Sequence, residues 1–349
     1  MGMAKVVSGL DDGRMRHSVV ALTGELAIAD RLPASVEVHC MHAWSNEPTL
    51  PIRLAGVIRR LRPTVIHARN WGAWPDTAAA RLLASPRLPL LLSFHGLGKA
   101  GYMPRRRRLA SWVLARMATR LLTNNNHSRE LMVAKWGWPR QKVEVIPNGV
   151  DADRFCPGDK SQNGQRVIVG TVGNLRPVKN HAMLIHACGD LFRRGVDVEV
   201  RIAGEGEERE NLMSLADSLG MKDRVALVGR VEDVPGFLKE LDVFVLSSDS
   251  EQHPNALNEA MACGLACVAT RVGCVDELLD EDRCGKIVPP GDREQMANAI
   301  GELISDRDLR KRLGAAARQR ACDHYSLANM LAAYEELYRK LSLNGVVPR

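Results

Sequence analysis

Short apolar runs alternate with helical patterns along almost all of the 349 residues. The runs are four to seven residues long, and amphipathic segments such as residues 51–61, 109–118 and 181–194 lie between them. Regular alternation of strand and helix is typical of βαβ units, in which the strands form parallel sheets. We therefore expect an α/β protein. Its expected strands are residues 17–22, 36–40, 64–67, 88–94, 120–123, 143–146, 167–172, 198–203, 225–229, 242–246, 266–270 and 285–288.

A polar stretch at residues 156–166, CPGDKSQNGQR, divides the chain into two parts. The length suggests about two domains, and a hydrophobic content of 45% is enough for two cores. We expect a Rossmann-like domain at residues 1–158, a second at residues 159–349 and a cleft between them, with the last helix packing back on the first domain. Ligands of such sheets bind at the carboxyl ends of the strands.

The net charge of +7 is unevenly distributed. Residues 1–158 carry 23 Lys and Arg against 11 Asp and Glu, whereas the remainder carries 25 against 30. The first part should therefore face an anionic partner, but no stacking aromatic motif accompanies its arginines, so we expect no nucleic acid. No run is long enough to span a membrane and no secretory segment opens the chain, which predicts a cytoplasmic protein with reduced cysteines. The spacing of cysteines and histidines gives no metal site.

The segment from Val243 to Thr270 predicts a phosphate site. It is a buried strand, a polar loop, a short helix and a second strand, with Pro254 at the expected first helical position and Gly264 just past the end. The backbone N–H groups of the first turn and the helix dipole favour an anion at that junction. The residues of that turn are Asn255, Ala256 and Leu257.

Two glutamates bracket this junction. Glu251 precedes the helix and Glu259 lies more than one turn inside it, so their carboxylates can reach opposite ends of a ligand whose anionic middle rests on the helix. A nucleotide sugar has that layout, although both glutamates could also be ordinary surface residues. The string E-x7-E followed by A-M-A-C-G resembles the donor-site signature of the retaining family four (group 1) glycosyltransferases. The resemblance implies a GT-B fold of two Rossmann-like domains.

Further strings carry the same resemblance. VIPNGVD at residues 145–151 resembles the strand end before the interdomain linker, and VGNLRPVKN at residues 172–180 resembles the loop that starts at Gly173. Family members usually carry an arginine and a lysine in that loop, against the donor diphosphate. Lys179 matches the lysine. The arginine position holds Asn174, and Arg176 follows two residues later.

Two segments of the second part resemble the segments that surround the nucleotide base in this family. They are RIAGEG at residues 201–206, which contains Gly204, and VGRV at residues 228–231, which contains Arg230 and Val231. In the first part, His95 closes a strand and matches a position that faces donor sugar and acceptor in several relatives. As a lone histidine it would more often be structural. Residues 63–70, PTVIHARN, resemble a signature of transferases from exopolysaccharide clusters.

The resemblance implies transfer of a sugar from a nucleotide diphosphate, such as a UDP- or GDP-sugar, with retention and without metal or other cofactor. Lys179, Arg176 and the helix at Asn255 would neutralise the leaving group. Glu251 would bind hydroxyls of the donor sugar and Glu259 the ribose. The acceptor would be lipid-linked or a saccharide, in cell-surface or exopolysaccharide synthesis. The alternatives are a non-catalytic sugar-nucleotide-binding protein and a nucleotide-sugar epimerase of the same fold.

Two features lie outside these motifs. Relatives begin with a strand and a glycine-rich loop, whereas only 16 residues precede the first expected strand here, so we expect that opening strand and loop to be missing. The run Arg105-Arg106-Arg107-Arg108 leads into a helix in which Leu109, Trp112, Val113 and Met117 recur at helical spacing. That stripe either packs on its own sheet or docks, with the arginines, on an anionic membrane at the cytoplasmic face.

Overall fold

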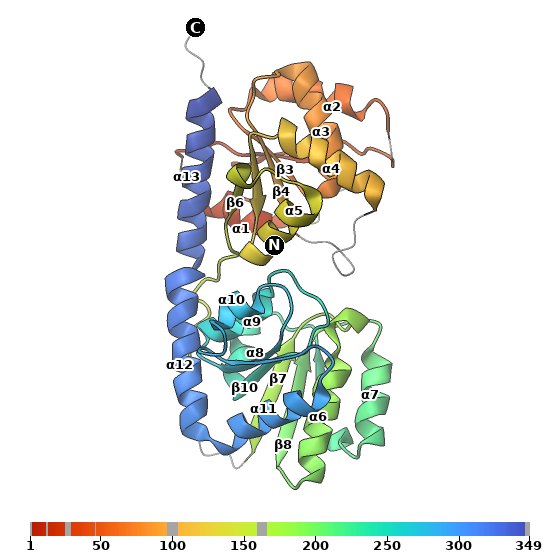
Figure 1. Ribbon diagram of the computed structural model, residues 1–349, viewed down its shortest axis with the longest axis vertical. Helices are drawn as coiled ribbons and strands as arrows, with labels where there is room; N and C mark the ends of the chain where they lie inside the picture. The colour runs from red at the N-terminus through yellow and green to blue at the C-terminus, as the bar shows by residue number, and fades with distance from the viewer. Residues whose placement is uncertain are drawn as a thin grey trace. The chain divides into compact units, whose positions relative to one another are not determined.

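The computed structural model describes residues 2–11, 13–24, 29–45, 47–95, 104–158 and 166–345. The chain forms two compact units, the first made of residues 1–148 and 328–349 and the second of residues 149–327. Both are α/β units with parallel strands (Figure 1). Each of the twelve expected strands is present, with ends within two residues of the expected ones.

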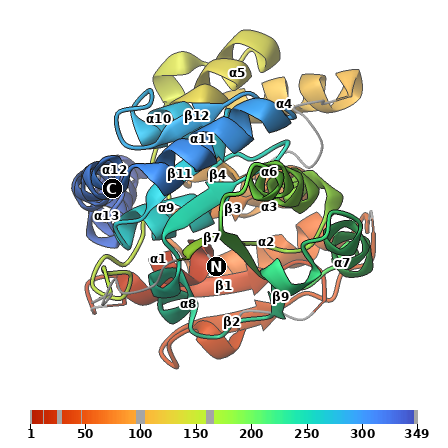
Figure 2. The same ribbon diagram turned by 90° about the horizontal axis from the view of Figure 1, so that it is seen from below.

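The second unit contains one six-stranded parallel sheet. Its strands are β7 (Val167–Val172), β8 (Val198–Ala203), β9 (Val225–Gly229), β10 (Val243–Leu246), β11 (Ala266–Thr270) and β12 (Lys286–Val288). Its helices are α6 (His181–Arg193), α7 (Arg209–Ser218), α8 (Val234–Glu240), α9 (Asn255–Ala262), α10 (Val275–Leu279), α11 (Arg293–Ser305) and α12 (Arg307–His324). Helices α6 and α7 lie side by side, as Figure 1 and Figure 2 both show.

The sheet of the second unit is buried on both faces. Along β10, Val243 and Val245 belong to one hydrophobic cluster, whereas Phe244 and Leu246 belong to the other. This division follows from the pleat, which points successive side chains of a strand to opposite faces. Since Phe244 is fully buried, its truncation to alanine should cost about 3 to 5 kcal/mol of stability.

The strand order of this sheet is β12-β11-β10-β7-β8-β9. It is the usual order 3-2-1-4-5-6 of a Rossmann sheet, read from the other end. The order reverses between β7 and β10, which are direct neighbours. The helices that follow these two strands, α6 and α9, pack on opposite faces of the sheet, and ligands of such sheets bind at the carboxyl edge where the chain divides in this way.

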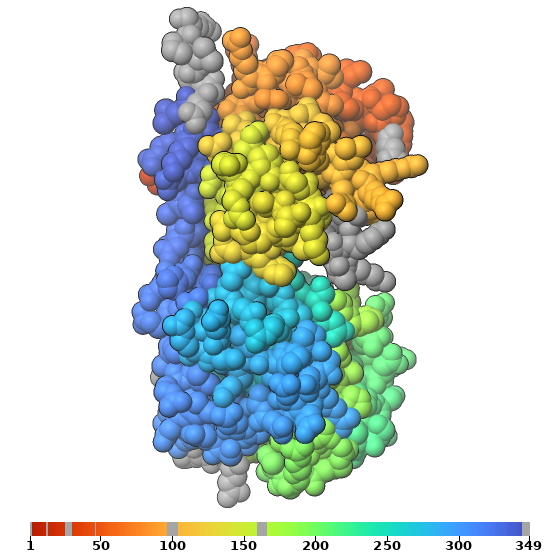
Figure 3. Space-filling model, in the orientation of Figure 1, coloured from red at the N-terminus to blue at the C-terminus, as the bar shows by residue number. Residues whose placement is uncertain are grey.

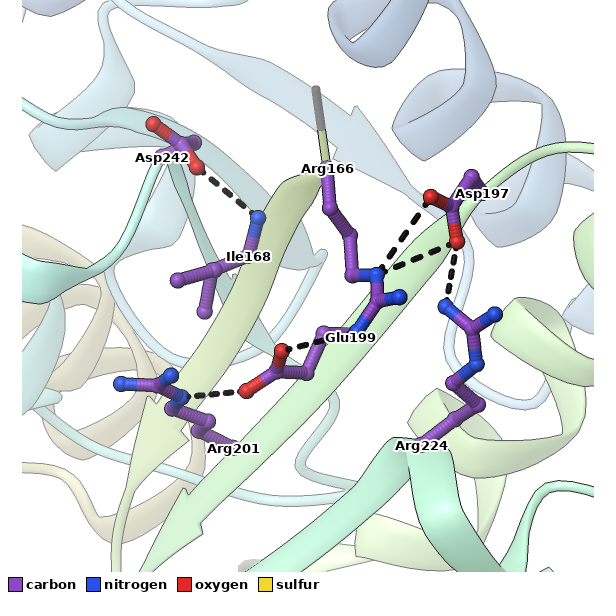
Figure 4. A network of polar contacts seen from close by, with 7 residues as sticks. All are labelled: Arg166, Ile168, Asp197, Glu199, Arg201, Arg224 and Asp242. Carbon is purple, nitrogen blue, oxygen red and sulfur yellow. Dashed lines mark hydrogen bonds and ion pairs between the residues drawn. The ribbon is translucent and has the colours of Figure 1, made fainter. Parts of the chain in front are cut away.

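The opposite, amino-terminal edge of this sheet is tied together by polar contacts (Figure 4). Arg166 and Arg224, at the starts of β7 and β9, both reach Asp197, which precedes β8. The Asp242 carboxylate accepts a hydrogen bond from the backbone N–H of Ile168 at 2.8 Å. The Glu199 carboxylate forms ion pairs with both Arg166 and Arg201, and its Oε1 lies 2.7 Å from the Arg201 Nε. These groups satisfy one another and leave ligand binding to the carboxyl edge.

The first unit contains two separate parallel sheets, β1-β2 and β3-β4-β5-β6. The strands are β1 (Ser18–Ala21), β2 (Glu37–Cys40), β3 (Ile66–Arg69), β4 (Leu90–Phe94), β5 (Arg120–Thr123) and β6 (Val143–Val145). The helices are α1 (Gly2–Gly9), α2 (Leu50–Leu61), α3 (Trp74–Ala84), α4 (Arg105–Met117), α5 (Asn126–Trp136) and α13 (Leu327–Gly345). Within the described residues β1 and β3 are not paired with each other. The usual Rossmann order has its first strand at that position.

The division of the chain differs from the expected boundary at residue 158. Residues 149–158 belong to the second unit because Val150 exchanges backbone hydrogen bonds with Tyr325 and Leu327, at 2.8 and 2.7 Å, and Phe155 packs in the second unit's core. Helix α13 belongs to the first unit, where Tyr338 is hydrogen-bonded to His67. The polar composition of residues 156–166 therefore marked a position after the true boundary.

Helix α4 exposes most of its apolar stripe, since Leu109, Trp112 and Val113 are exposed and Met117 is half-buried. Its buried residues are Ser111, Leu114 and Ala115. Ser111 is buried because its hydroxyl accepts a hydrogen bond from the Trp138 indole at 2.8 Å. The helix also begins earlier than expected and includes all four arginines of the run. The alternative in which this stripe packs on its own sheet is therefore wrong for Leu109, Trp112 and Val113, whereas docking on a membrane stays a prediction.

Candidate functional site

Hydrogen bonds join the loops that follow β7 and β10 at the carboxyl edge of the second unit's sheet. The backbone N–H of Asp249 donates to the Val178 carbonyl at 2.9 Å, and the Asn180 side chain donates to the Asp249 carboxylate at 2.8 Å. The Ser247 hydroxyl donates to the Lys179 carbonyl at 3.1 Å. These contacts lie at the point where the strand order reverses, so they shape the crevice in which a ligand is expected.

Lys179 and Glu251 form an ion pair within this region. The Lys179 ammonium lies 2.5 Å from Glu251 Oε1, and the Ser248 hydroxyl donates to the same oxygen at 2.9 Å. Their side chains are 28% and 14% exposed, so both remain within reach of a ligand. The sequence predicted each residue for the site but gave no sign that they touch.

Glycine at position 273 allows the loop after β11 to approach the loop that carries Glu251. A Cβ atom at Gly273 would lie 2.5 Å from the Glu251 carbonyl oxygen, and the residue has a φ of +58°. The next residue, Cys274, donates its N–H to the Gln252 carbonyl at 3.2 Å. Any larger residue must therefore displace the backbone of Glu251. Gly273 was not among the predicted site residues, although a glycine just past a parallel strand is a usable signal.

Backbone hydrogen bonds join the loops after β7, β8 and β9 in the same way. Gly173 donates to the Ala203 carbonyl at 2.9 Å, and Gly204 donates to the Gly229 carbonyl at 2.8 Å. A Cβ atom at Gly204 would lie 1.9 Å from the Gly173 oxygen, so only glycine fits there. The predicted base-side residues Arg230 and Val231 directly follow Gly229. The structure thus brings these predicted residues to one edge of the sheet.

The start of α9 differs from the sequence prediction by one residue. Pro254 is the cap and not the first helical residue, since its ψ of 97° is extended and its carbonyl accepts from the N–H groups of Leu257 and Asn258, at 3.1 and 3.3 Å. The Leu257 N–H, expected to face a phosphate, is therefore used inside the helix. This restricts the expected phosphate seat to Asn255 and Ala256. Half-buried Glu259 lies in the same helix.

The end of α9 is as predicted, because the helix stops at Ala262 and Gly264 adopts a φ of +73°.

Asn174 and Arg176 both have exposed side chains in the loop after β7. The Asn174 carbonyl accepts from the Arg176 N–H at 2.9 Å and from His181 Nε2 at 3.2 Å. Burial lowers the pKa of His181, so this imidazole is neutral and carries its proton on Nε2. No partner for the Arg176 guanidinium is seen among the described residues, which leaves its charge available.

His95 lies in the first unit, at the carboxyl end of β4. Its Nε2 is 3.0 Å from the Ser93 hydroxyl, and its backbone N–H donates to the Asn70 side chain at 3.3 Å. Burial, assisted by the nearby Arg69 charge, lowers the pKa of His95 to about 3. This histidine is therefore neutral at any physiological pH and can act only as a hydrogen-bonding group.

In the described part of the chain, no three His, Cys, Asp or Glu side chains are grouped so that they could hold a metal ion. All eight cysteines lie in that part, and each is a free thiol. None of the helices described there is both long and apolar enough to cross a membrane. The absence of a metal requirement stays a prediction.

The exposed surface of α4 is partly apolar. Leu109, Trp112 and Val113 are 66%, 42% and 43% exposed. The four arginines at the start of the helix are also exposed. In Figure 3 the gold surface of this part of the chain lies on the visible face of the first unit. A basic and apolar patch of this kind is a candidate docking surface.

Two family models match consecutive parts of the chain. The model described as Glycosyltransferase Family 4 matches residues 5–154, and the model described as Glycosyl transferases group 1 matches residues 157–320. The two matches together include nearly every element of both units. The chain belongs to the group 1 glycosyltransferases. The predicted family is thereby confirmed.

Several curated relatives of this glycosyltransferase act on different substrates. The N-acetyl-alpha-D-glucosaminyl L-malate synthase of Bacillus anthracis is 26% identical over 57% of this chain and 54% of its own length. The UDP-Gal:alpha-D-GlcNAc-diphosphoundecaprenol alpha-1,3-galactosyltransferase of Escherichia coli is 26% identical, over 66% and 62%. The lipopolysaccharide core biosynthesis glycosyltransferase LpsE of Rhizobium meliloti is 28% identical, over 86% and 83%. The chain thus spans little more than half the length of the first of these relatives.

Solved structures confirm the fold of the glycosyltransferase. A glycosyltransferase from Rickettsia africae ESF-5 superposes with a TM-score of 0.86 at 19% identity, over 97% of this chain and 94% of that one. The Anabaena protein HepE, solved in complex with UDP, gives a TM-score of 0.84 at 22% identity, over 97% and 95%. These likenesses show the GT-B fold of two Rossmann-like domains, as the sequence predicted.

Proposed function

We propose that this glycosyltransferase moves a sugar from a nucleoside diphosphate sugar to a lipid-linked or saccharide acceptor, with retention of anomeric configuration. The observation that carries the proposal is the Lys179–Glu251 pair at the reversal point of the second sheet. This pair presents a cation for a diphosphate and a carboxylate for sugar hydroxyls at one place. The names of the relatives, which include a UDP-galactose-dependent transferase and a lipopolysaccharide core enzyme, support a role in cell-surface or exopolysaccharide synthesis.

Within this proposal, Lys179 neutralises charge that develops on the departing diphosphate. The start of α9 adds backbone N–H groups and the positive end of a helix dipole, and the exposed Arg176 supplies a second cation. These groups replace a divalent metal ion in the reaction. Besides donor and acceptor, the reaction requires no cofactor.

The two glutamates bind the ends of the donor. Glu251 accepts hydrogen bonds from hydroxyls of the transferred sugar, while its other contacts, to Lys179 and Ser248, fix its orientation. Glu259 binds the ribose, and the base lies against Arg230 and Val231. Neither glutamate attacks the sugar. His95 donates or accepts a hydrogen bond at the sugar and does not transfer a proton, because a pKa of about 3 makes its imidazole too weak a base.

The exposed patch of α4 supports a further part of the proposal, docking on an anionic membrane at the cytoplasmic face. Four arginines in the first turn oppose the helix dipole and repel one another, a cost that anionic headgroups relieve. The neighbouring Leu109, Trp112 and Val113 offer apolar surface to the same boundary. Such docking would bring the enzyme to lipid-linked acceptors.

The test is turnover of UDP- and GDP-sugars with a polyprenyl-diphosphate sugar or a free saccharide as acceptor. We expect release of nucleoside diphosphate only with acceptor, undiminished by EDTA, and a product with the anomeric configuration of the donor by NMR. Epimerised donor without any acceptor would instead support the epimerase alternative. UDP binding by calorimetry without turnover of any donor would support a non-catalytic sugar-nucleotide-binding protein.

A further inference from the structure

A continuous chain of hydrogen-bonding side chains ends at His95 in the first unit. The Tyr338 hydroxyl lies 2.8 Å from His67 Nδ1, and His67 Nε2 lies 2.7 Å from the Ser93 hydroxyl. Ser93 in turn is 3.0 Å from His95 Nε2. The four side chains come from β3, from β4 and its end, and from α13, which is the last helix of the chain.

The four hydrogen-bonded side chains are packed closely enough to stay in place. Ser93 is fully buried. The His67 ring packs beside two aromatic rings of α13, with ring centroids 6.3 Å from Tyr334 and 5.9 Å from Tyr338. Since α13 packs against β3 in the same unit, the carboxyl-terminal helix contributes directly to the surroundings of His95.

Both imidazoles in the chain are neutral. Burial holds the pKa of His67 well below its usual value, and the charge of Arg69 lowers it further. The same two causes act on His95. Each ring therefore carries one proton, on one nitrogen, and every hydrogen bond in the chain has a direction.

Ser93 couples the directions of these bonds. Its hydroxyl has one hydrogen, so it can donate to only one imidazole and must accept from the other. A phenol hydroxyl is a stronger hydrogen-bond donor than acceptor, so we assign the hydrogen of the Tyr338 hydroxyl to the bond with His67 Nδ1. His67 then donates from Nε2 to Ser93, and Ser93 donates to His95 Nε2. The proton of His95 is left on Nδ1.

We propose that Tyr338, His67 and Ser93 are positioning residues that fix the tautomer and orientation of His95, so that its Nδ1–H donates to an oxygen of the bound sugar. This inference rests on the proposed sugar transfer for the identity of the partner oxygen, but the tautomer itself does not depend on it. The carboxyl-terminal helix thereby acts on the reaction from a position that no donor motif includes.

The first test is NMR spectroscopy of the full chain labelled with 15N-histidine, with the His95 signals among ten histidines assigned from a His95→Gln variant. We expect wild-type His95 to show a protonated Nδ1 and no titration between pH 5 and 8. Tyr338→Phe and Ser93→Ala should each shift the His95 ring nitrogens toward the other tautomer. Unchanged His95 signals in both variants would overturn the proposal.

The matched control is Ser342→Ala. Ser342 also lies on α13 and forms a hydrogen bond with Thr64 beside β3, at 3.2 Å, but it takes no part in the chain to His95. We expect the His95 signals of this variant to match the wild type. If Ser342→Ala shifts the His95 signals as strongly as Tyr338→Phe, the shifts come from a general loosening of α13. The proposed positioning of His95 by Tyr338, His67 and Ser93 would then be wrong.

The second test is steady-state kinetics of the same variants, with thermal melts to verify folding. Tyr338→Phe and Ser93→Ala should each lower kcat about tenfold with little change in the donor KM, and the double variant should be no worse than either. If the His95 tautomer shifts and kcat does not change, the tautomer of His95 has no role in sugar transfer. Absence of any turnover in the wild type, with the tautomer shifts present, would instead contradict the proposed function alone.

Discussion

Lys179 and Glu251 are 72 residues apart in the sequence and form an ion pair with 2.5 Å between Nζ and Oε1. Lys179 follows the first strand of the second sheet and Glu251 follows the fourth, and these strands are neighbours where the strand order reverses. Each residue thus holds the other in position at the carboxyl edge of the sheet.

Replacement of either partner should stop sugar transfer and leave the unit folded. For Lys179→Ala and for Glu251→Ala we expect kcat to fall about 100- to 1,000-fold, because each removes a contact to donor charge or hydroxyls. Loss of one partner should also cost about 1 to 3 kcal/mol of stability, since the other is left partly buried without a countercharge. Turnover and thermal melts are measured on the same samples.

The control for this prediction is Lys286→Ala. Lys286 pairs with Glu302 at 3.0 Å in the same unit, with side chains 30% and 50% exposed, but it lies at the start of β12 and so away from the carboxyl edge of the sheet. The Lys286→Ala substitution should change neither turnover nor stability by more than a small amount. Wild-type rates in Lys179→Ala or Glu251→Ala would show that the site is assigned to the wrong residues.

Gly273→Ala should lower turnover by moving Glu251. The added Cβ would lie 2.5 Å from the Glu251 carbonyl oxygen, so the loop with Glu251 and Gln252 has to shift. Gly220→Ala is the matched control, because Gly220 has a similar φ of +69° but no atom within 4 Å of its added Cβ. Both substitutions should cost about 1 to 2 kcal/mol for the left-handed backbone. Only Gly273→Ala should reduce kcat. Equal activity of the two variants would argue against a role of Gly273 in positioning Glu251.

Arg176 should compensate for the arginine that Asn174 replaces. Both side chains are exposed in the loop after β7, so either can carry a cation to the donor without repacking. Asn174→Arg should be tolerated, whereas Arg176→Ala should weaken UDP binding about tenfold, as expected for loss of one charged contact. Calorimetry with UDP decides the matter. Normal UDP affinity in Arg176→Ala would show that this arginine has no such role.

His253 makes the second unit sensitive to acid. Its ring is buried against Tyr325, neither ring nitrogen has a hydrogen-bond partner among the described residues, and burial lowers its pKa to about 4. Between pH about 6.5 and about 4 the unfolded chain binds a proton at this residue and the folded chain does not. Stability is therefore full above pH 6.5 and should decline as the pH falls through this range.

His253→Phe should relieve this sensitivity. Phenylalanine keeps the ring packing and removes two unpaired polar atoms, so we expect a gain of about 1 to 2 kcal/mol at pH 7 and a larger gain at pH 5. Thermal melts across pH 4 to 8 provide the measurement. His324→Gln, at an exposed position of the same unit, serves as the comparison variant. A His253→Phe profile parallel to that of the wild type would contradict the assignment to His253.

The arginine run should bind anionic vesicles. Compared with wild type, a variant with Arg105, Arg106, Arg107 and Arg108 changed to glutamine should lose co-sedimentation with phosphatidylserine-containing vesicles, because each basic residue contributes about 1 kcal/mol near such a surface. High salt should weaken wild-type binding, and neutral vesicles should bind neither protein. Equal sedimentation of the two proteins at low salt would defeat the proposed docking.

The sequence by itself determined the α/β class, the twelve strands of the described residues and most of the predicted site residues at the carboxyl edge of the second sheet. Apolar runs such as residues 243–246 are local signals, since burial on both faces requires hydrophobic side chains at every position of a short strand. The donor motifs are also local, because turns and helix ends fix the residues around Lys179 and Glu251 within a few positions of the chain. Local composition cannot report distant pairs, however.

Only the tertiary structure decided which distant residues meet. It paired Lys179 with Glu251, placed Gly273 against the Glu251 backbone and attached Tyr338 to His67 across 271 positions of sequence. It also selected the buried face of α4 through the Ser111–Trp138 hydrogen bond. The physical reason is that periodicity records whether a side chain is buried, whereas its partner depends on strand order and on how helices pack, which arise from contacts over the whole unit.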